Sequence, residues 1–241
     1  QHIDANGQRQ WAGKGLAVCT LPSGQGMVRM VLDGKGGVII AWFDIRDGYW
    51  TVYAQRVSAD GTFLWNLDGV CLCDAPGSQV LDDHKLMISP DDTGDTLIAW
   101  YDYRSTARYD IYAQRISLSG SLLWTSGGKP VDISTTGTKY GASLVPDGLG
   151  GCIFSYHNDL SGDYADIWAT RLNIVGDILW SKPICKTTAR SYNATSAPDG
   201  NNGAIIVWQD NRSGTEDIYA QRIDRDGNAK WATNGIPICS A

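Results

Sequence analysis

The apolar positions of this chain fall into short runs that return with the same polar ending. Three nearly continuous apolar runs end in the pattern Trp-x-Asp-x-Arg, at 41–46, 99–104 and 207–212. An apolar run of this length between turn residues predicts a strand that is buried on both faces. Each run precedes an alternating segment of the Ile-Tyr-Ala-Gln-Arg type, which predicts a second strand with one face toward a core.

The whole pattern repeats, and this sets the expected architecture. A degenerate copy of the pattern, at 156–180, lies between the second and the last of the clear copies. Self-similarity at a period of roughly 50–60 residues is typical of a propeller or another stacked array. We name the four short strands of each repeat A to D in chain order. The sequence therefore predicts an all-β protein, a β-propeller of four-stranded antiparallel blades in one domain, with repeats at 21–74, 75–133, 134–186 and 187–241.

The outer strands D outnumber the repeats by one. Each strand D carries a tryptophan, and these are Trp11, Trp65, Trp124, Trp180 and Trp231. Residues 1–20 are thus an extra outer strand, although the last repeat already has its own. Three outcomes stay open: a four-bladed ring with a surplus edge strand, a piece of a larger propeller, or an open end that docks on a second chain.

The turns complete the pattern and point to a family. Strand A ends in a Pro-Asp-Gly turn at 146–148 and 198–200, and a turn with glycine at a constant position joins strands C and D. We expect that glycine to have a positive φ. This order resembles the TolB-type and PD40 (WD40-like) propeller repeats, as in long secreted bacterial repeat proteins. The resemblance implies that strand A lines a central axis and strand D the rim, and it transfers no activity.

Composition excludes several classes of partner. The chain has 241 residues, a net charge of −6 and a pI near 4.9, so it lacks the basic surface that nucleic acids require. No apolar run approaches the roughly 18 residues needed to cross a bilayer, so we expect no membrane insertion. The histidines are too scattered for a metal motif, and we expect no metal and no cofactor. We place the protein outside the cytoplasm, secreted or at the cell surface.

Four cysteines stand at equivalent positions near the end of strand D: Cys19, Cys73, Cys185 and Cys239. Equivalent positions on outer strands are a blade width apart, which exceeds the roughly 4.4–6.8 Å between the Cα atoms of a disulfide. We therefore expect buried, mostly free thiols.

The Asp-x-Arg pairs admit two interpretations. A ring of arginines could hold a carboxylate or sulfate in bidentate fashion. Alternatively, each pair acts with the Gln-Arg of strand C to tie strands and blades together, which we favour because a packing solution recurs in every unit. The predicted structural network consists of Asp44, Asp102, Asp210, Gln55, Arg56, Gln114, Arg115, Gln221 and Arg222, while Arg46, Arg104 and Arg212 stay candidates for ligand binding.

The third repeat departs from the pattern, because Asn158 replaces the aspartate and Leu160 the arginine. If one blade carries a specific function, this corner between strands B and C is the candidate. The alternative is neutral sequence variation in a surface loop, which tolerates substitution. Aromatic residues in the other B–C loops could stack on sugar rings. The remaining ligand-binding candidates are Tyr49, Trp50, Tyr103, Tyr109, His157, Asp159 and Tyr164.

No catalytic motif stands out. Glu216 is the single glutamate, and neither a Gly-x-Ser-x-Gly elbow nor the Ser-x-Asp-x-Gly-x-x-Trp box of sialidases is present. We predict that the chain is not an enzyme but a binding or scaffold propeller for a glycan or a surface protein. The alternatives are a structural subunit that self-assembles head to tail through the surplus strand, and a sialidase-like glycoside hydrolase.

Overall fold

The computed structural model describes residues 1–11, 13–75, 86–105, 108–134, 136–159 and 165–239. Within them, regular structure is all strand, in four antiparallel sheets. The first two sheets consist of β1 (Gln25–Leu32), β2 (Val38–Asp44), β3 (Thr51–Val57) and β4 (Val70–Cys71), and of β5 (Met87–Pro90), β6 (Thr96–Asp102), β7 (Asp110–Ile116) and β8 (Lys129–Pro130). The last two consist of β9 (Thr138–Pro146), β10 (Cys152–Asp159), β11 (Ala165–Leu172) and β12 (Ile178–Cys185), and of β13 (Ser191–Pro198), β14 (Ala204–Asp210), β15 (Asp217–Ile223) and β16 (Ile236–Cys239).

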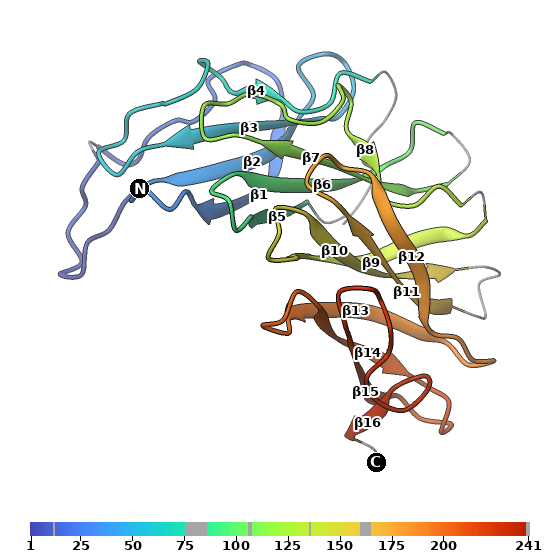
Figure 1. Ribbon diagram of the computed structural model, residues 1–241. Coiled ribbons are helices and arrows are strands. Elements are labelled where there is room, and N and C mark those ends of the chain that lie inside the picture. Colours follow the sequence, from blue (N-terminus) through green and yellow to red (C-terminus); the bar gives the residue numbers. More distant parts are fainter. Residues whose placement is uncertain (12, 76–85, 106–107, 135, 160–164, 240–241) are drawn as a thin grey trace.

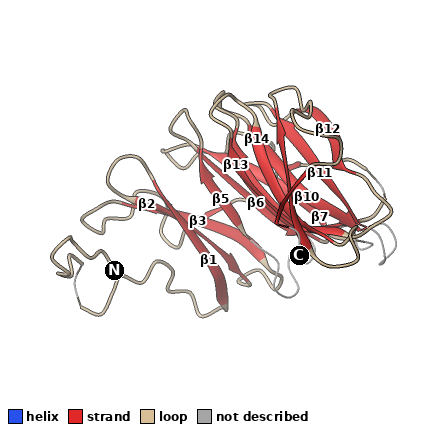
Figure 2. Ribbon diagram, turned by 90° about the horizontal axis from the view of Figure 1, so that it is seen from below, coloured by secondary structure: helices blue, strands red, loops and turns tan. Residues whose placement is uncertain are grey.

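The sheets are the blades of a β-propeller, as predicted. In every sheet the strands are paired in chain order, and we number the blades first to fourth. The innermost strands β1, β5, β9 and β13 follow one another around an axis, and the sheets fan out from it in an open arc (Figures 1 and 2). The first and fourth blades form the two ends of this arc.

The N-terminal segment, which the sequence predicted as an extra outer strand, contains an isolated bridge but no regular strand among its described residues. Ile3 is bridged to Arg9 across the turn at Gly7, in the way that Val57 is bridged to Phe63. Residues 2 and 3 thus match the end of a strand C, and the residues that follow match a strand D. The chain therefore consists of four complete blades preceded by the outer edge of another.

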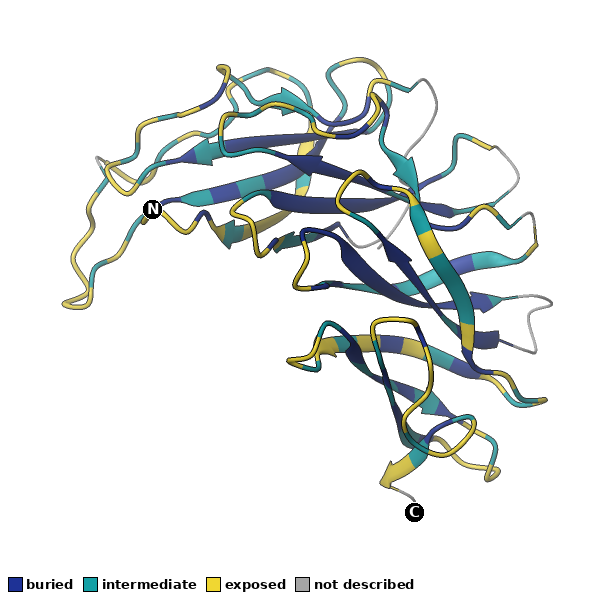
Figure 3. Cartoon of the chain, in the orientation of Figure 1, coloured by how far each residue is buried: buried dark blue, intermediate teal, exposed yellow. Residues whose placement is uncertain are grey.

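The core lies between successive blades rather than inside one of them. One cluster joins Ile39 and Ala41 of the first blade to Ile98 and Trp100 of the second, and similar clusters fill the next two junctions. Because each middle blade is covered on both sides, β6 and β10 are buried along almost their whole length (Figure 3).

The end blades differ from the middle ones. Val38 and Ile40 in β2 are half-buried, while Ile98, which matches Ile40 in the second blade, is fully buried. At the other end, Ile205 and Val207 in β14 are half-buried on the opposite face. The prediction that strand B is buried on both faces is therefore wrong for these two strands, because each lacks a neighbouring blade on one side.

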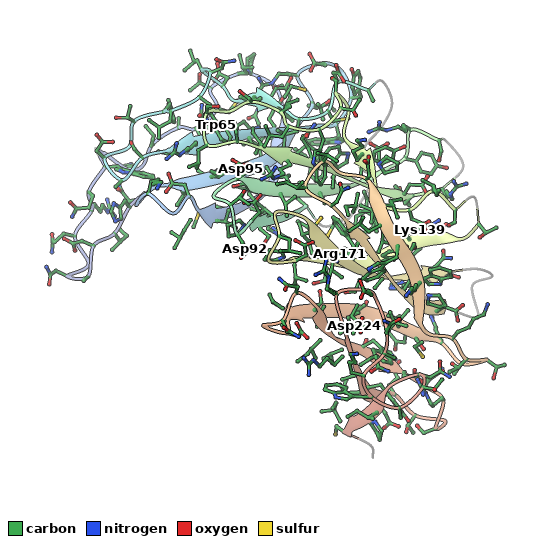
Figure 4. All side chains as sticks on the ribbon, in the orientation of Figure 1. Trp65, Asp92, Asp95, Lys139, Arg171 and Asp224 are labelled. Atoms are coloured by element: carbon green, nitrogen blue, oxygen red, sulfur yellow. The ribbon has the colours of Figure 1, made fainter. Side chains whose placement is uncertain are left out.

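The blades are locked together through the turn that joins strands C and D. Trp65 of the first blade donates its indole N–H to the carbonyl of Leu118 in the second, at 3.0 Å (Figure 4). The indole also lies against Gly120, where an added Cβ would be 2.8 Å from Trp65 Cδ1. Gly120 has a φ of 85°, and the equivalent glycines also have positive φ, as predicted. Glycine is thus required at this turn both by its backbone conformation and by the packed indole.

Candidate functional site

The Asp-x-Arg pairs form one recurring cluster at the end of each strand B, except in the third blade. In the second blade, Arg104 Nη2 lies 2.5 Å from Asp102 Oδ2, and the indole of Trp100 donates to the same oxygen at 3.0 Å. The guanidinium also donates to the Gly127 carbonyl at 2.9 Å and stacks on the ring of Tyr112, 3.8 Å from its centroid. The same contacts surround Arg46 with Asp44 and Tyr53, and Arg212 with Asp210 and Tyr219.

Hydrogen bonds keep Asp44 and Asp210 of this recurring Asp–Arg cluster ionised in spite of their burial. Burial opposes ionisation of Asp44, yet hydrogen bonds from Arg46, Trp42 and Ser23 outweigh it and lower the pKa of Asp44 to about 2. The pKa of Asp210 is also lowered to about 2. Since each guanidinium is engaged by a carboxylate, a carbonyl and an aromatic ring of its own blade, we infer that these arginines pack the blade rather than bind a ligand.

The Gln-Arg pair of strand C has two separate tasks. Gln55 Oε1 accepts the backbone N–H of Trp65 at 3.1 Å, and its amide donates to Asn66 at 2.7 Å, which fixes strand D. Arg56 Nε lies 2.8 Å from Asp33 in the A–B turn, and its Nη1 donates to Leu118 of the next blade. The predicted network residues that make the corresponding contacts are Gln114, Arg115, Gln221 and Arg222, the last only with its own blade.

In the third blade a lysine provides the buried cation. Lys139 of β9 is fully buried, and its Nζ lies 3.4 Å from Asp132 and 3.7 Å from Asp110 (Figure 4). Asp132 stands where the other outer strands carry cysteine. The same Nζ donates to the carbonyls of Thr136 and Gly137. This arrangement was not predicted, because Lys139 lies on strand A and not at the altered B–C corner.

A row of aromatic rings crosses from the second blade to the third at the same end of the sheets. The ring centroids of Tyr103 and Tyr109 are 4.9 Å apart, those of Tyr109 and Tyr140 6.3 Å, and those of Tyr140 and His157 5.7 Å. Tyr103, Tyr109 and Tyr140 are half-buried and therefore present part of their faces to solvent. The structure thus brings three sequence-predicted ligand candidates together and adds Tyr140.

His157 connects this aromatic row to the fourth blade. Its Nδ1 accepts the backbone N–H of Asn193 at 3.4 Å, and burial lowers the pKa of His157 to about 4, so the ring is neutral at pH 7. The approach is close: a Cβ on Gly141 would lie 2.8 Å from His157 Nδ1. Gly141 and Asn193 both have positive φ, in bulges of the innermost strands where the register shifts. Bulges of this kind re-aim neighbouring side chains and are frequent beside active sites.

Beside Asn193 lies a tyrosine–carboxylate pair. The Tyr192 hydroxyl donates a hydrogen bond to Glu216 Oε1, and the Arg190 guanidinium lies 5.2 Å from the centroid of the Tyr192 ring. The hydrogen bond to Glu216 raises the pKa of Tyr192, and the charge of Arg190 opposes this shift. Glu216 is exposed and Tyr192 half-buried, so the pair is open to a ligand.

A pocket of about 410 Å³ opens on the axis between the innermost strands. All four blades line it, with Arg29 from the first, Ile88 from the second, Ser143 from the third and Asn193 from the fourth. Asn193 therefore belongs both to the axial pocket and to the contact with His157. The candidate functional site consists of this pocket, the aromatic row and the Tyr192–Glu216 pair.

Other predicted residues lie elsewhere. Tyr49 and Trp50 belong to the first blade, and Trp50 packs against the core between the first two blades. Asp159 ends β10, two residues beyond His157. Tyr164 lies outside the described residues. The cysteine prediction was wrong for Cys239, which is exposed, whereas Cys73 and Cys185 are buried; no disulfide joins the six cysteines in the described part of the chain.

In the part of the chain that the structure describes, no three His, Cys, Asp or Glu side chains are grouped so that they could hold a metal ion. Nor do these residues include a helix with the length and apolar character needed to cross a membrane.

The fold resembles that of several solved structures. No family model and no curated protein matches the chain. A protein of unknown function from Dyadobacter fermentans has a TM-score of 0.56 at 11% identity, over 90% of this chain and 68% of the other. An α-L-arabinofuranosidase from Fusarium graminearum, solved with an iminosugar inhibitor, has a TM-score of 0.54 at 12% identity, over 87% and 67%. An α-L-arabinofuranosidase from Lactobacillus brevis has a TM-score of 0.45 at 10% identity, over 86% and 75%.

The Dyadobacter and Fusarium structures, whose TM-scores exceed 0.5, support the propeller fold but not the TolB/PD40 resemblance in particular. They also contradict the prediction of a non-catalytic binding or scaffold module, and the prediction that the chain is not an enzyme, because the neighbours with a named activity are glycoside hydrolases. We withdraw both predictions. Identities this low establish the fold alone, so the activity itself needs an argument from the site.

Proposed function

We propose that this chain is a glycoside hydrolase whose reaction centre is the Tyr192–Glu216 pair beside the axial pocket. The observation that carries the proposal is the hydrogen bond from the Tyr192 hydroxyl to Glu216, with Arg190 over the ring. A hydroxyl becomes a usable nucleophile when an adjacent base can take its proton. Tyrosine nucleophiles occur in sialidase-type glycosidases.

The pair supports a double-displacement reaction. Tyr192 Oη attacks the anomeric carbon while its proton passes to Glu216, and the bond to the leaving oxygen breaks as that oxygen takes a proton from a carboxylic acid. We assign the proton donor to Asp159, the carboxyl that ends β10, two residues beyond the His157 that contacts Asn193. Water then attacks the anomeric carbon and gives a proton to the Asp159 carboxylate. The bond to Tyr192 Oη breaks, and this oxygen takes its proton back from Glu216. The positive charge of Arg190 favours the negative charge that develops on Tyr192 Oη.

The surroundings suit a carbohydrate. The half-buried rings of Tyr103, Tyr109 and Tyr140 offer apolar faces, and Asn193 offers an amide at the pocket wall. The Fusarium enzyme shares the fold and is an α-L-arabinofuranosidase, which makes arabinofuranosides the first substrates to test. We further propose that the protein works outside the cytoplasm, where such polysaccharides occur, and that any kinship with TolB/PD40 repeats concerns the scaffold alone.

The test is hydrolysis of a panel of aryl glycosides, beginning with 4-nitrophenyl α-L-arabinofuranoside and an aryl sialoside. We expect Tyr192→Phe and Glu216→Gln each to lower kcat at least about 100-fold, because each removes a group that acts in the transition state. Tyr49→Phe, in the loop between β2 and β3 that corresponds to the loop of Glu216, is the control and should keep full activity. Circular dichroism verifies folding of each variant. Equal rates for Tyr192→Phe and the wild type, or no turnover of any substrate, would refute the proposal.

A further inference from the structure

Successive blades are joined by the same polar contacts: a tryptophan and an arginine bond one carbonyl at all three junctions, and a cysteine accepts from an arginine at the first and the third. Between the first and second blades, Trp65 Nε1 and Arg56 Nη1 both donate to the Leu118 carbonyl, at 3.0 and 2.9 Å, and Cys73 Sγ accepts from Arg104 at 3.2 Å. The corresponding donors at the next two junctions are Trp124 and Arg115 to Ile174, and Trp180 and Arg171 to Arg225, while Cys185 accepts from Arg212.

The fourth blade carries the same donors, and within residues 1–239 as the structure describes them no blade covers its outer side. Within the described residues, neither the indole N–H of Trp231 nor Nη1 of Arg222 has an acceptor. The Arg222 side chain is 38% exposed, compared with 14% for Arg56. Cys239, the equivalent of Cys73, is exposed. Together with half-buried Val207, these side chains form a free face, the forward face of the fourth blade.

At the other end, residues 1–20 occupy the place of a preceding blade's outer strand. Trp11 Nε1 donates to the Ala59 carbonyl at 3.0 Å, His2 Nδ1 lies 3.1 Å from the same oxygen, and Cys19 accepts from Arg46 at 3.4 Å. The segment repeats the spacing of the last outer strand: Ile3, Trp11 and Cys19 match Ile223, Trp231 and Cys239. The N-terminal segment therefore stands where a fourth-blade outer strand would fit.

The N-terminal segment covers only the outer edge of the first blade. The apolar face of β1 and β2 next to it stays open. Apolar pockets of about 370 and 340 Å³ separate the segment from the first blade, and they are lined by Val18, Met30 and Ile40 among others. Met30 is 67% exposed and Leu32 74%. At the three internal junctions, the inner strands of the neighbouring blade cover this position.

We propose that the forward face of the fourth blade docks on the first blade of a second copy of this chain, with residues 223–239 replacing residues 1–20 of that copy. The two segments offer matching groups. Trp231 and Arg222 would donate to the Ala59 carbonyl of the second copy, which Trp11 and His2 contact in the single chain. Cys239 would replace Cys19 as the acceptor for Arg46. The exchange also buries Val207 and Ile205 against the apolar face that the N-terminal segment leaves open, and this adds a driving force that the segment alone lacks. The contact repeats the internal junctions and does not depend on the proposed enzymatic activity.

Light scattering coupled to size exclusion tests the proposal on the full chain. We expect the wild-type mass to rise with concentration. Val207→Asp removes the forward face and Ile40→Asp the opposite face, so each variant alone should keep the mass of one chain. Their mixture should form a dimer and stop there, because one competent face of each kind remains. Val175→Asp, an exposed turn residue of the third blade, is the matched control and should assemble like the wild type.

Two further readouts make the result decisive. Trp11→Ala weakens the N-terminal segment, so assembly should begin at an about tenfold lower concentration, as loss of one hydrogen bond would give. The Cys239 thiol should react with Ellman's reagent in the single chain and become protected on assembly. A constant mass of one chain for both the wild type and Trp11→Ala would overturn the proposal. Assembly of Val207→Asp with wild-type concentration dependence would overturn it as well.

Discussion

Replacing Lys139 by methionine should destabilise the protein strongly, because it removes a cation from a fully buried site. Lys139 is 0% exposed, and its partners Asp132 and Asp110 are 8% and 11% exposed. Asp110 keeps a second partner, Arg108, at 3.0 Å, so only Asp132 loses its cation. Breaking a buried pair costs about 3–5 kcal/mol, and the remaining Arg108 contact places the expected loss near the lower end, about 3 kcal/mol.

Urea denaturation at pH 7, followed by tryptophan fluorescence, measures this loss. Lys129→Met is the matched control, because Lys129 pairs with Asp177, which is 63% exposed, at 3.2 Å. An exposed pair of this kind contributes about 0–1 kcal/mol. The difference between the two lysine variants therefore isolates the effect of burial.

A second substitution tests the cause. The equivalents of Asp132 in the other outer strands are cysteines, so Asp132→Cys in the Lys139→Met background removes the uncompensated charge and should restore about 1–3 kcal/mol. A loss below 1 kcal/mol for Lys139→Met, or no recovery in the double variant, would show that this reasoning about the buried charge is wrong.

Two other predictions concern packing and pH. Gly120→Ala should lower the free energy of unfolding in urea by about 2–4 kcal/mol, because the positive φ and the clash with Trp65 add up. Gly214→Ala is the control: its φ is 98°, but no atom lies within 4 Å of the added Cβ, so the free energy of unfolding should fall by only about 1–2 kcal/mol. Since the pKa of His157 is about 4 when folded and 6.5 when unfolded, the unfolded chain binds more protons between these values, and stability should fall by about 2 kcal/mol from pH 7 to pH 5. His157→Asn should remove that loss; an unchanged pH profile would exclude His157 as its source.

The blade pattern could be predicted because its signals recur. The run ending in Trp42, Trp100 or Trp208 and the turn glycines such as Gly120 are demanded by the same packing in each unit, so one motif identified them all. The exposure of Val38 and Ile205 could not be predicted, because it depends on whether a blade lies beside them. That is a property of the array and not of the local sequence.

The candidate site was predictable only in part. His157 and Tyr109 stood out because they lie in or beside B–C corners, where loops carry function. Lys139 and Tyr192 were missed because they lie on strand A, whose sequence repeats least. Their roles depend on contacts across strands and blades, such as that between Tyr192 and Glu216, 24 residues apart in the chain.

The register of the strands explains how one scaffold provides different chemistry in neighbouring blades. Tyr140 and Tyr192 occupy the same position of strand A, opposite His157 and Gln209, and Tyr109 and Glu216 both directly precede strand C. In one case the two positions bring together Tyr109 and Tyr140, two aromatic rings from adjacent blades; in the other they bring together a phenol and a carboxylate within one blade. Because the Asp–Arg cluster and the Trp-to-carbonyl bonds hold the backbone, these two positions are free to vary. In such an array the invariant residues maintain the fold, and a reaction centre belongs at the positions where the repeats disagree.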